Sequence, residues 1–120
     1  MNKEKLEKIK LYIQNSKSMN TQRSYASDWR HFTEWCKLNG QDPLPASAST
    51  ICLYLSELAT THKYSTIKRR VSSINIAHKF KHHLPPSKEV EVQALLEGIK
   101  REIGIRQEPK KALLLQVLPA

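Results

Sequence analysis

Apolar residues recur at helical spacing along most of the chain, and glycine, proline or serine residues separate one such stretch from the next. Ile51, Tyr54, Leu55 and Leu58, for example, fall on one stripe of an α-helix. The sequence contains no apolar–polar alternation longer than a few residues, no glycine-rich phosphate loop and no internal repeat. The pattern therefore predicts an all-α fold, a compact bundle of four to five helices.

The spacing predicts the bounds of five helices. The expected N-caps are Asn20 for the second helix, Ser47 or Ser49 for the third, and Ser87 for the fifth, while Gly40 ends the second. The helices are expected over residues 3–15, 21–38, 47–61, 65–81 and 88–103. We expect three parts, which are an N-terminal helix and linker (1–17), a core helical domain (18–104), and a linker with the start of a further domain (105–120).

Four further apolar stripes complete the expected helix faces. They are Leu6, Ile9, Tyr12 and Ile13; Tyr25, Trp29, Phe32 and Cys36; Ile67, Val71, Ile74 and His78; and Val92, Leu95, Leu96, Ile99 and Ile103. The first helix is short, so we expect it to be marginal unless it packs on something. Ile76 and Phe80 lie away from the stripe of the fourth helix (Ile67 to His78), which predicts that the second half of this helix is buried between neighbours.

The composition indicates an anionic partner. The 120 residues carry a net charge of +9 and a pI near 9.7, which favours nucleic acid first and a membrane surface second. No run of 18 apolar residues is present, and the charged N-terminus does not resemble a signal peptide. Cys36 and Cys52 form no CxxC motif, so we expect two reduced thiols in a cytoplasmic protein.

The most basic stretch runs from Leu58 to Lys88 and contains seven Lys or Arg, four His and no Asp or Glu. Within it, one helix face combines cations with small hydroxyl side chains, namely Ser65, Lys68, Arg69, Ser72 and Lys79. The outer face of residues 21–38 repeats the combination with Arg23, Ser27 and Arg30, beside Thr21 and Ser24. Such faces suit a DNA groove, because cations meet phosphates and short side chains allow close approach. A solvated basic face is the alternative interpretation.

Several motifs occur in an order typical of one family. They are Asn20-Thr21 followed by Trp29, Phe32 and Trp35-Cys36-Lys37; Ile51 to Ala59; Ser65-Thr66-Ile67 with Ser72-Ser73-Ile74 and Ala77-His78; Leu96 to Arg101; and Lys110-Lys111-Ala112. With these motifs, residues 18–118 resemble the N-terminal core-binding, SAM-like domain of the tyrosine recombinases, the phage integrase family with its Cre-like members.

The resemblance implies a helical domain that clamps one side of duplex DNA, beside other protomers of the same recombinase. The implied DNA-binding residues are Thr21, Arg23, Ser24, Ser27, Arg30, Ser65, Thr66, Lys68, Arg69, Ser72, Lys79 and Lys81. Arg69 is the first choice for reading a guanine, whereas Lys68, Arg70, Lys79 and Lys81 suit phosphates. The resemblance puts the catalytic residues in the domain that follows, so this chain is expected to bind DNA without cutting it. No cofactor, metal or small-molecule ligand is expected.

Four other interpretations compete with this one. In a helix-turn-helix regulator the two DNA-binding helices follow each other in the sequence across a short turn. Here a whole apolar helix lies between the two basic ones in the sequence. A helical protein–protein interaction module would use its charge for solubility alone. His78, His82 and His83 have partial metal-ligand spacing but lack a convincing further ligand. No acid–base or nucleophile arrangement indicates an enzyme acting alone.

Overall fold

The computed structural model describes residues 2–16 and 18–106, and this part of the chain is helical without a β-strand. The helices are α1 (Lys3–Asn15), α2 (Met19–Leu38), α3 (Ala48–Leu58), α4 (Tyr64–Phe80), the 3-10 turn η1 (Pro86–Lys88) and α5 (Val90–Arg106). The predicted all-α class is confirmed. The expected start of a further domain lies almost wholly outside the described residues.

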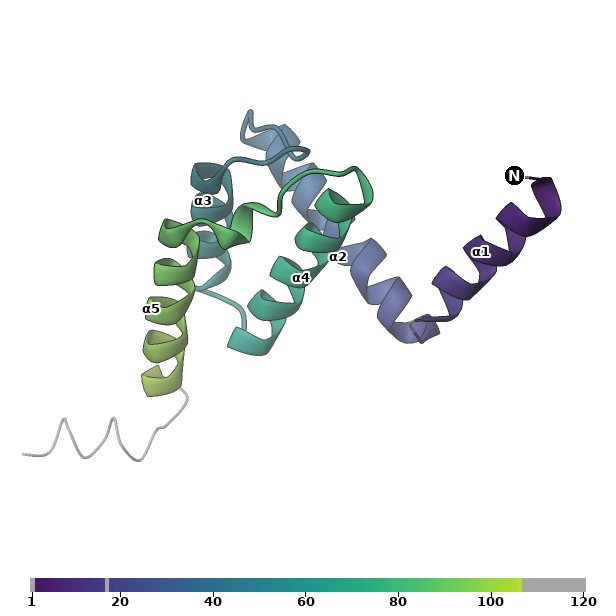
Figure 1. Ribbon diagram of the computed structural model, residues 1–120. Helices are drawn as coiled ribbons and strands as arrows, with labels where there is room; N and C mark the ends of the chain where they lie inside the picture. The colour runs from purple at the N-terminus through teal and green to yellow at the C-terminus, as the bar shows by residue number, and fades with distance from the viewer. Residues whose placement is uncertain (1, 17, 107–120) are drawn as a thin grey trace, which may run out of the picture.

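Helices α2 to α5 gather into the bundle, whereas α1 extends away from it (Figure 1). Helix α2 packs mainly against α4, and α3 packs mainly against α5. The turn η1 contacts α3, α4 and α5 and so links the two pairs. The two helices with basic faces are therefore direct neighbours in space, although α3 separates them along the chain.

The core forms where the predicted stripes meet. Ile51, Tyr54, Leu55 and Leu58 of α3 are all buried, as predicted. Phe32 of α2 packs edge-on against Tyr54, with ring centroids 4.9 Å apart. The predicted stripe of α4 is also buried, and the α5 stripe is buried at Val92, Ile99 and Ile103. Phe80, however, is 67% exposed, so the expected burial at the end of α4 is wrong for this residue.

Two helix starts differ from the sequence prediction by two residues. Helix α2 begins at Met19 because Ser18, rather than Asn20, is the N-cap; its hydroxyl accepts a hydrogen bond from the Thr21 backbone N–H at 3.1 Å. Helix α5 begins at Val90 because residues 86–88 form the 3-10 turn. It continues through Gly104 to Arg106, beyond the predicted end. The predicted caps Ser47 and Gly40 are confirmed, since Ser47 caps α3 and Gly40 has a φ of 63°.

Helix α1 has no buried residue. Its apolar stripe remains 42–67% exposed at Leu6, Ile9, Tyr12 and Ile13. The side-chain amide of Gln22 on α2 donates a hydrogen bond to the carbonyl of Gln14 near the end of α1. The apolar face of α1 is thus formed but unpacked within the described part of the chain.

Several sequence expectations about other classes of site can be compared with the structure. Both cysteines are free, and burial together with the Asp42 charge raises the pKa of the Cys36 thiol to about 11. Among residues 2–16 and 18–106, no group of three His, Cys, Asp or Glu side chains is placed to hold a metal ion. Within the same residues, no helix has the length and apolar character needed to cross a membrane.

His78 is a buried structural residue of α4. Its Nε2 accepts a hydrogen bond from the Ala46 backbone N–H at 2.9 Å, and its Nδ1 donates to the Ile74 carbonyl, 2.8 Å away. The ring also lies edge-on to those of Trp29 and His83. Burial lowers the pKa of His78; the hydrogen bond to Ile74 opposes this shift, and the His83 charge adds to it. Protonation would break the bond that ties the loop before α3 to α4.

We therefore expect the domain to lose stability on acidification. The folded-state pKa of His78 lies below its unfolded value of about 6.5, so its contribution is complete above that pH and falls as pH decreases. Stability should therefore decrease from about pH 7.5 to about pH 5.5, as the unfolded chain binds a proton that the folded domain resists. Thermal unfolding of wild type and His78→Gln at both pH values measures it. Because burial also lowers the pKa of His31, the difference between the two proteins isolates His78; equal pH dependence would refute its role.

Candidate nucleic-acid interface

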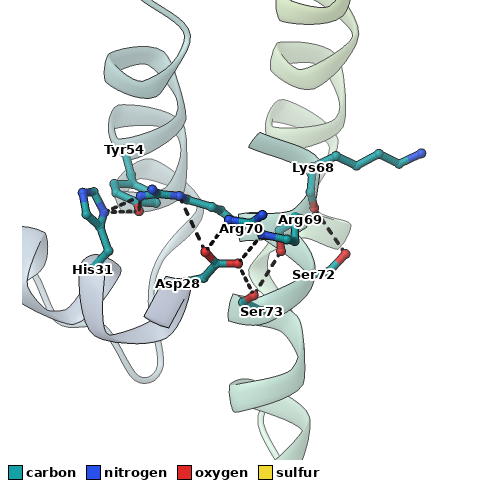
Figure 2. A network of polar contacts seen from close by, with 8 residues as sticks. All are labelled: Asp28, His31, Tyr54, Lys68, Arg69, Arg70, Ser72 and Ser73. Atoms are coloured by element: carbon teal, nitrogen blue, oxygen red, sulfur yellow. Dashed lines mark hydrogen bonds and ion pairs between the residues drawn. The ribbon is translucent and has the colours of Figure 1, made fainter. Parts of the chain in front are cut away.

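The seam between α2 and α4 is fixed by one buried carboxylate, Asp28, which is 3% exposed (Figure 2). Arg69 of α4 donates to it through Nε, 2.9 Å from Oδ2, and through Nη2, 3.0 Å from Oδ1. The Ser73 hydroxyl donates to Oδ2 at 2.9 Å. This bidentate pair is the strong form of an Arg–carboxylate contact, so it sets the position of the two basic helices relative to each other.

A second arginine, Arg70, reaches the same carboxylate from inside the bundle. Its Nε lies 3.9 Å from Asp28 Oδ1, and its Nη1 donates to the Tyr54 hydroxyl at 3.0 Å. Nη1 is also 2.6 Å from Nδ1 of His31, which accepts because arginine can only donate (Figure 2). The Arg70 side chain is 13% exposed, and its buried Nε has no hydrogen-bond partner. Arg70 is therefore placed as a structural cation linking α2, α3 and α4.

The protonation states follow from these contacts. The hydrogen bond to Asp28 raises the pKa of Arg69, so that guanidinium stays charged. Burial, and then the Arg70 charge, lowers the pKa of His31 and favours its neutral form. Burial also raises the pKa of Tyr54. With His31 and Tyr54 neutral, the network of one carboxylate and two guanidinium groups carries a net positive charge at the seam.

On α2, the predicted DNA-binding residues divide between the seam and the outer face. Arg23, Ser27 and Arg30 are exposed. Ser24 is half-buried and lies one turn before Asp28, on the seam side. Thr21 is half-buried, and its hydroxyl accepts a hydrogen bond from Ser18 Oγ at 2.8 Å.

On α4, the predicted residues surround Arg69, whose side chain is 46% exposed. Ser65 and Ser72 lie one turn before and after it, with Ser65 exposed and Ser72 half-buried. Ser72 donates to the Lys68 carbonyl at 3.2 Å, while the Lys68 side chain extends away from the network (Figure 2). Thr66 is half-buried. Ser24, Ser65 and Ser72 thus each lie within about one helical turn of the Asp28–Arg69 pair.

The last two predicted cations lie near the C-terminal end of α4. Lys79 lines a hollow of about 410 Å³ together with Gln22 and Tyr25, which places it beside the N-terminal half of α2. The remaining lining residues are Ile13, Gln14, Ser16, Ile76 and Phe80. Lys81 is exposed just after α4, and no described contact joins it to the other candidates.

Comparison with known proteins identifies the family. Residues 8–83 match the family model for the phage integrase N-terminal SAM-like domain. The chain belongs to the phage integrase family. It is also 39% identical over 114 residues to a protein of Selenomonas ruminantium described as an integrase/recombinase xerD homolog. That match covers 92% of this chain and 33% of the relative, so the chain spans about a third of that relative's length.

Sequence reasoning missed the centre of this integrase domain, the buried Asp28. The signal was present, because Asp28 stands three residues after Tyr25 and four before Phe32, within the apolar stripe of α2. A lone carboxylate on a buried stripe requires a cationic or hydrogen-bonding partner. The three partners, Arg69, Arg70 and Ser73, are all on α4. The tertiary pairing, rather than the residue types, was the missing information.

Proposed function

We propose that this chain is the DNA-binding arm of a site-specific tyrosine recombinase. It binds duplex DNA sequence-specifically through α2 and α4, while strand cleavage resides in a separate C-terminal domain of a longer protein. The observation that carries the proposal is the Asp28–Arg69 pair, which joins two helices whose other surfaces combine cations with small hydroxyl groups. Phosphate contacts hold such a domain in register, and groups near the seam approach the base edges.

The proposal divides the twelve predicted residues by chemistry. Exposed cations bind phosphates, namely Arg23, Arg30, Lys68, Lys79 and Lys81. Arg69 reads a base, because a guanidinium can donate two hydrogen bonds to guanine. The short hydroxyl side chains allow the helices to approach the groove, namely Thr21, Ser24, Ser27, Ser65, Thr66 and Ser72.

The proposed partners include other protomers of the same recombinase. Helix α1 supports this part of the proposal, because its exposed apolar stripe is flanked by Lys3, Lys5, Lys8 and Lys10. A stripe of this kind is typical of a helix that packs on another protein.

The free thiols and the proposed DNA substrate support a cytoplasmic location. In a helix-turn-helix regulator the two DNA-binding helices are consecutive, whereas here α3 lies between α2 and α4 in the chain.

Removing positive charges from the proposed DNA-binding surface tests the function directly. The triple variant Arg23→Ala, Arg30→Ala and Lys68→Ala is expected to bind a labelled duplex about tenfold to a hundredfold more weakly than wild type, because three phosphate contacts are lost. Fluorescence anisotropy at one fixed salt concentration measures the loss.

The matched control is the triple variant Lys3→Ala, Lys5→Ala and Lys8→Ala in α1, which removes the same net charge from a helix outside the bundle. It should change the affinity far less. Equal losses in the two variants would mean that overall charge, rather than the α2–α4 surface, governs binding. A change in self-association, with DNA binding intact in both, would favour the protein–protein interaction module.

A further inference from the structure

We propose that Asp28 is a positioning residue for DNA recognition, because it orients Arg69 so that one edge of the guanidinium is held and the other is presented to a base. The inference rests on the proposed function and adds a determinant of its specificity. Asp28 itself is buried and on this proposal does not touch DNA.

The hydrogen-bonding geometry of Arg69 supports a divided role. The guanidinium carries five N–H groups in a planar fork, and the pair with Asp28 uses Nε and Nη2. The other edge, formed by Nη1 and the second N–H of Nη2, is not used by Asp28 and can donate two hydrogen bonds, as guanine recognition requires. The side chain is 46% exposed, so this residue is both anchored and accessible.

Asp28 is in turn held by groups that fix its own orientation. Ser73 is 2% exposed and donates to Oδ2, the oxygen that also accepts from Arg69 Nε. Arg70 Nε lies 3.9 Å from the other carboxylate oxygen, Oδ1. A flexible arginine loses conformational freedom when it binds, and a fixed carboxylate removes much of that freedom beforehand. The arrangement therefore favours discrimination between bases over simple attraction to phosphate.

Replacing Asp28 with Asn is predicted to lower the sequence specificity of DNA binding without lowering the general affinity for DNA. Asp28→Asn replaces two carboxylate acceptors with one amide oxygen, which releases the fork of Arg69, and it also removes a negative charge near the DNA. The variant should bind a duplex of arbitrary sequence at least as tightly as wild type, but lose about tenfold of its discrimination at one base pair. Loss of folding alone would weaken both kinds of binding together.

The experiment uses the full chain and a pool of duplexes with a randomised segment, from which wild type selects its preferred sequence. Each base pair of that sequence is then exchanged in turn. The ratio of the affinity for the preferred duplex to the affinity for the exchanged duplex is measured for wild type, Asp28→Asn, Arg69→Lys and Glu34→Gln. Arg69→Lys keeps the charge without the fork and so identifies the base pair that Arg69 reads. Glu34→Gln removes an exposed acid from the same helix and should leave every ratio unchanged.

The inference requires that Asp28→Asn and Arg69→Lys lose discrimination at the same base pair. It is overturned if Asp28→Asn keeps the wild-type ratio at that pair, or if Arg69→Lys affects none. Should Asp28→Asn fail to fold, Ser73→Ala replaces it and must lower the affinity ratio at the base pair that Arg69 reads. An unchanged ratio at that base pair overturns the inference. A wild type that binds no duplex would instead refute the proposed function itself.

Discussion

Asp28→Ala is expected to lower the free energy of unfolding by about 3–5 kcal/mol. The change removes the carboxylate from Arg70, which is 13% exposed and whose buried Nε already has no hydrogen-bond partner. Ser73 also loses a buried acceptor, whereas the half-exposed Arg69 can return to solvent. Because small domains are stable by only about 5–15 kcal/mol, the effect should be large in urea unfolding followed by tryptophan fluorescence.

Two further variants test whether the loss of stability comes from leaving the Arg70 charge buried without a carboxylate, and not simply from removing an acidic residue from α2. Glu34→Ala, at an exposed position of the same helix, should change stability by less than about 0.5 kcal/mol. The double variant Asp28→Leu with Arg70→Met should recover much of the loss, because apolar replacements remove the uncompensated charge. A cost below about 1 kcal/mol for Asp28→Ala would show that water or local rearrangement satisfies Arg70 without the carboxylate.

The helices and their core faces could be predicted because each apolar stripe is a local property of the sequence. Ile51, Tyr54 and Leu58, for instance, are buried as their spacing requires. Helix starts were less predictable, because neighbouring residues compete for one role. Ser18 and Asn20 are both good N-caps, and Ser18 gains a second hydrogen bond, to the Thr21 hydroxyl. Phe80 is exposed because it lines the open hollow beside α1 and α2 instead of packing into the core, which local periodicity could not indicate.

The candidate interface was predictable as two basic faces but not as a network. Arg69 and Asp28 are 41 positions apart in the chain, and nothing local to either residue specifies that pairing. The sequence interpretation could therefore treat Arg69 as a free cation and Arg70 as a phosphate ligand. Packing of α2 on α4 gives both arginines a shared carboxylate, with different exposure for each. Whether each predicted residue contacts DNA stays a prediction.

The affinity for duplex DNA is expected to fall by roughly 500-fold when the salt concentration rises from about 50 to about 200 mM. The estimate uses the five exposed cations of the proposed phosphate-binding set, Arg23, Arg30, Lys68, Lys79 and Lys81. Each phosphate contact contributes about 0.9 to the slope of log affinity against log salt, so the slope should be about −4.5. A series of anisotropy titrations at several salt concentrations measures it.

The same series applied to the two triple variants locates the contacts that produce the slope. Removing Arg23, Arg30 and Lys68 should reduce its magnitude by about 2.7, leaving roughly −1.8. Removing Lys3, Lys5 and Lys8 from α1 should leave the wild-type slope, because net charge alone does not release the counterions condensed at contacted phosphates. A nearly flat wild-type slope would contradict the DNA-binding function, and equal slopes in the two variants would exclude α2 and α4 as its location. If the wild-type slope is flat, the net charge of +9 serves solubility, as the interaction-module alternative requires.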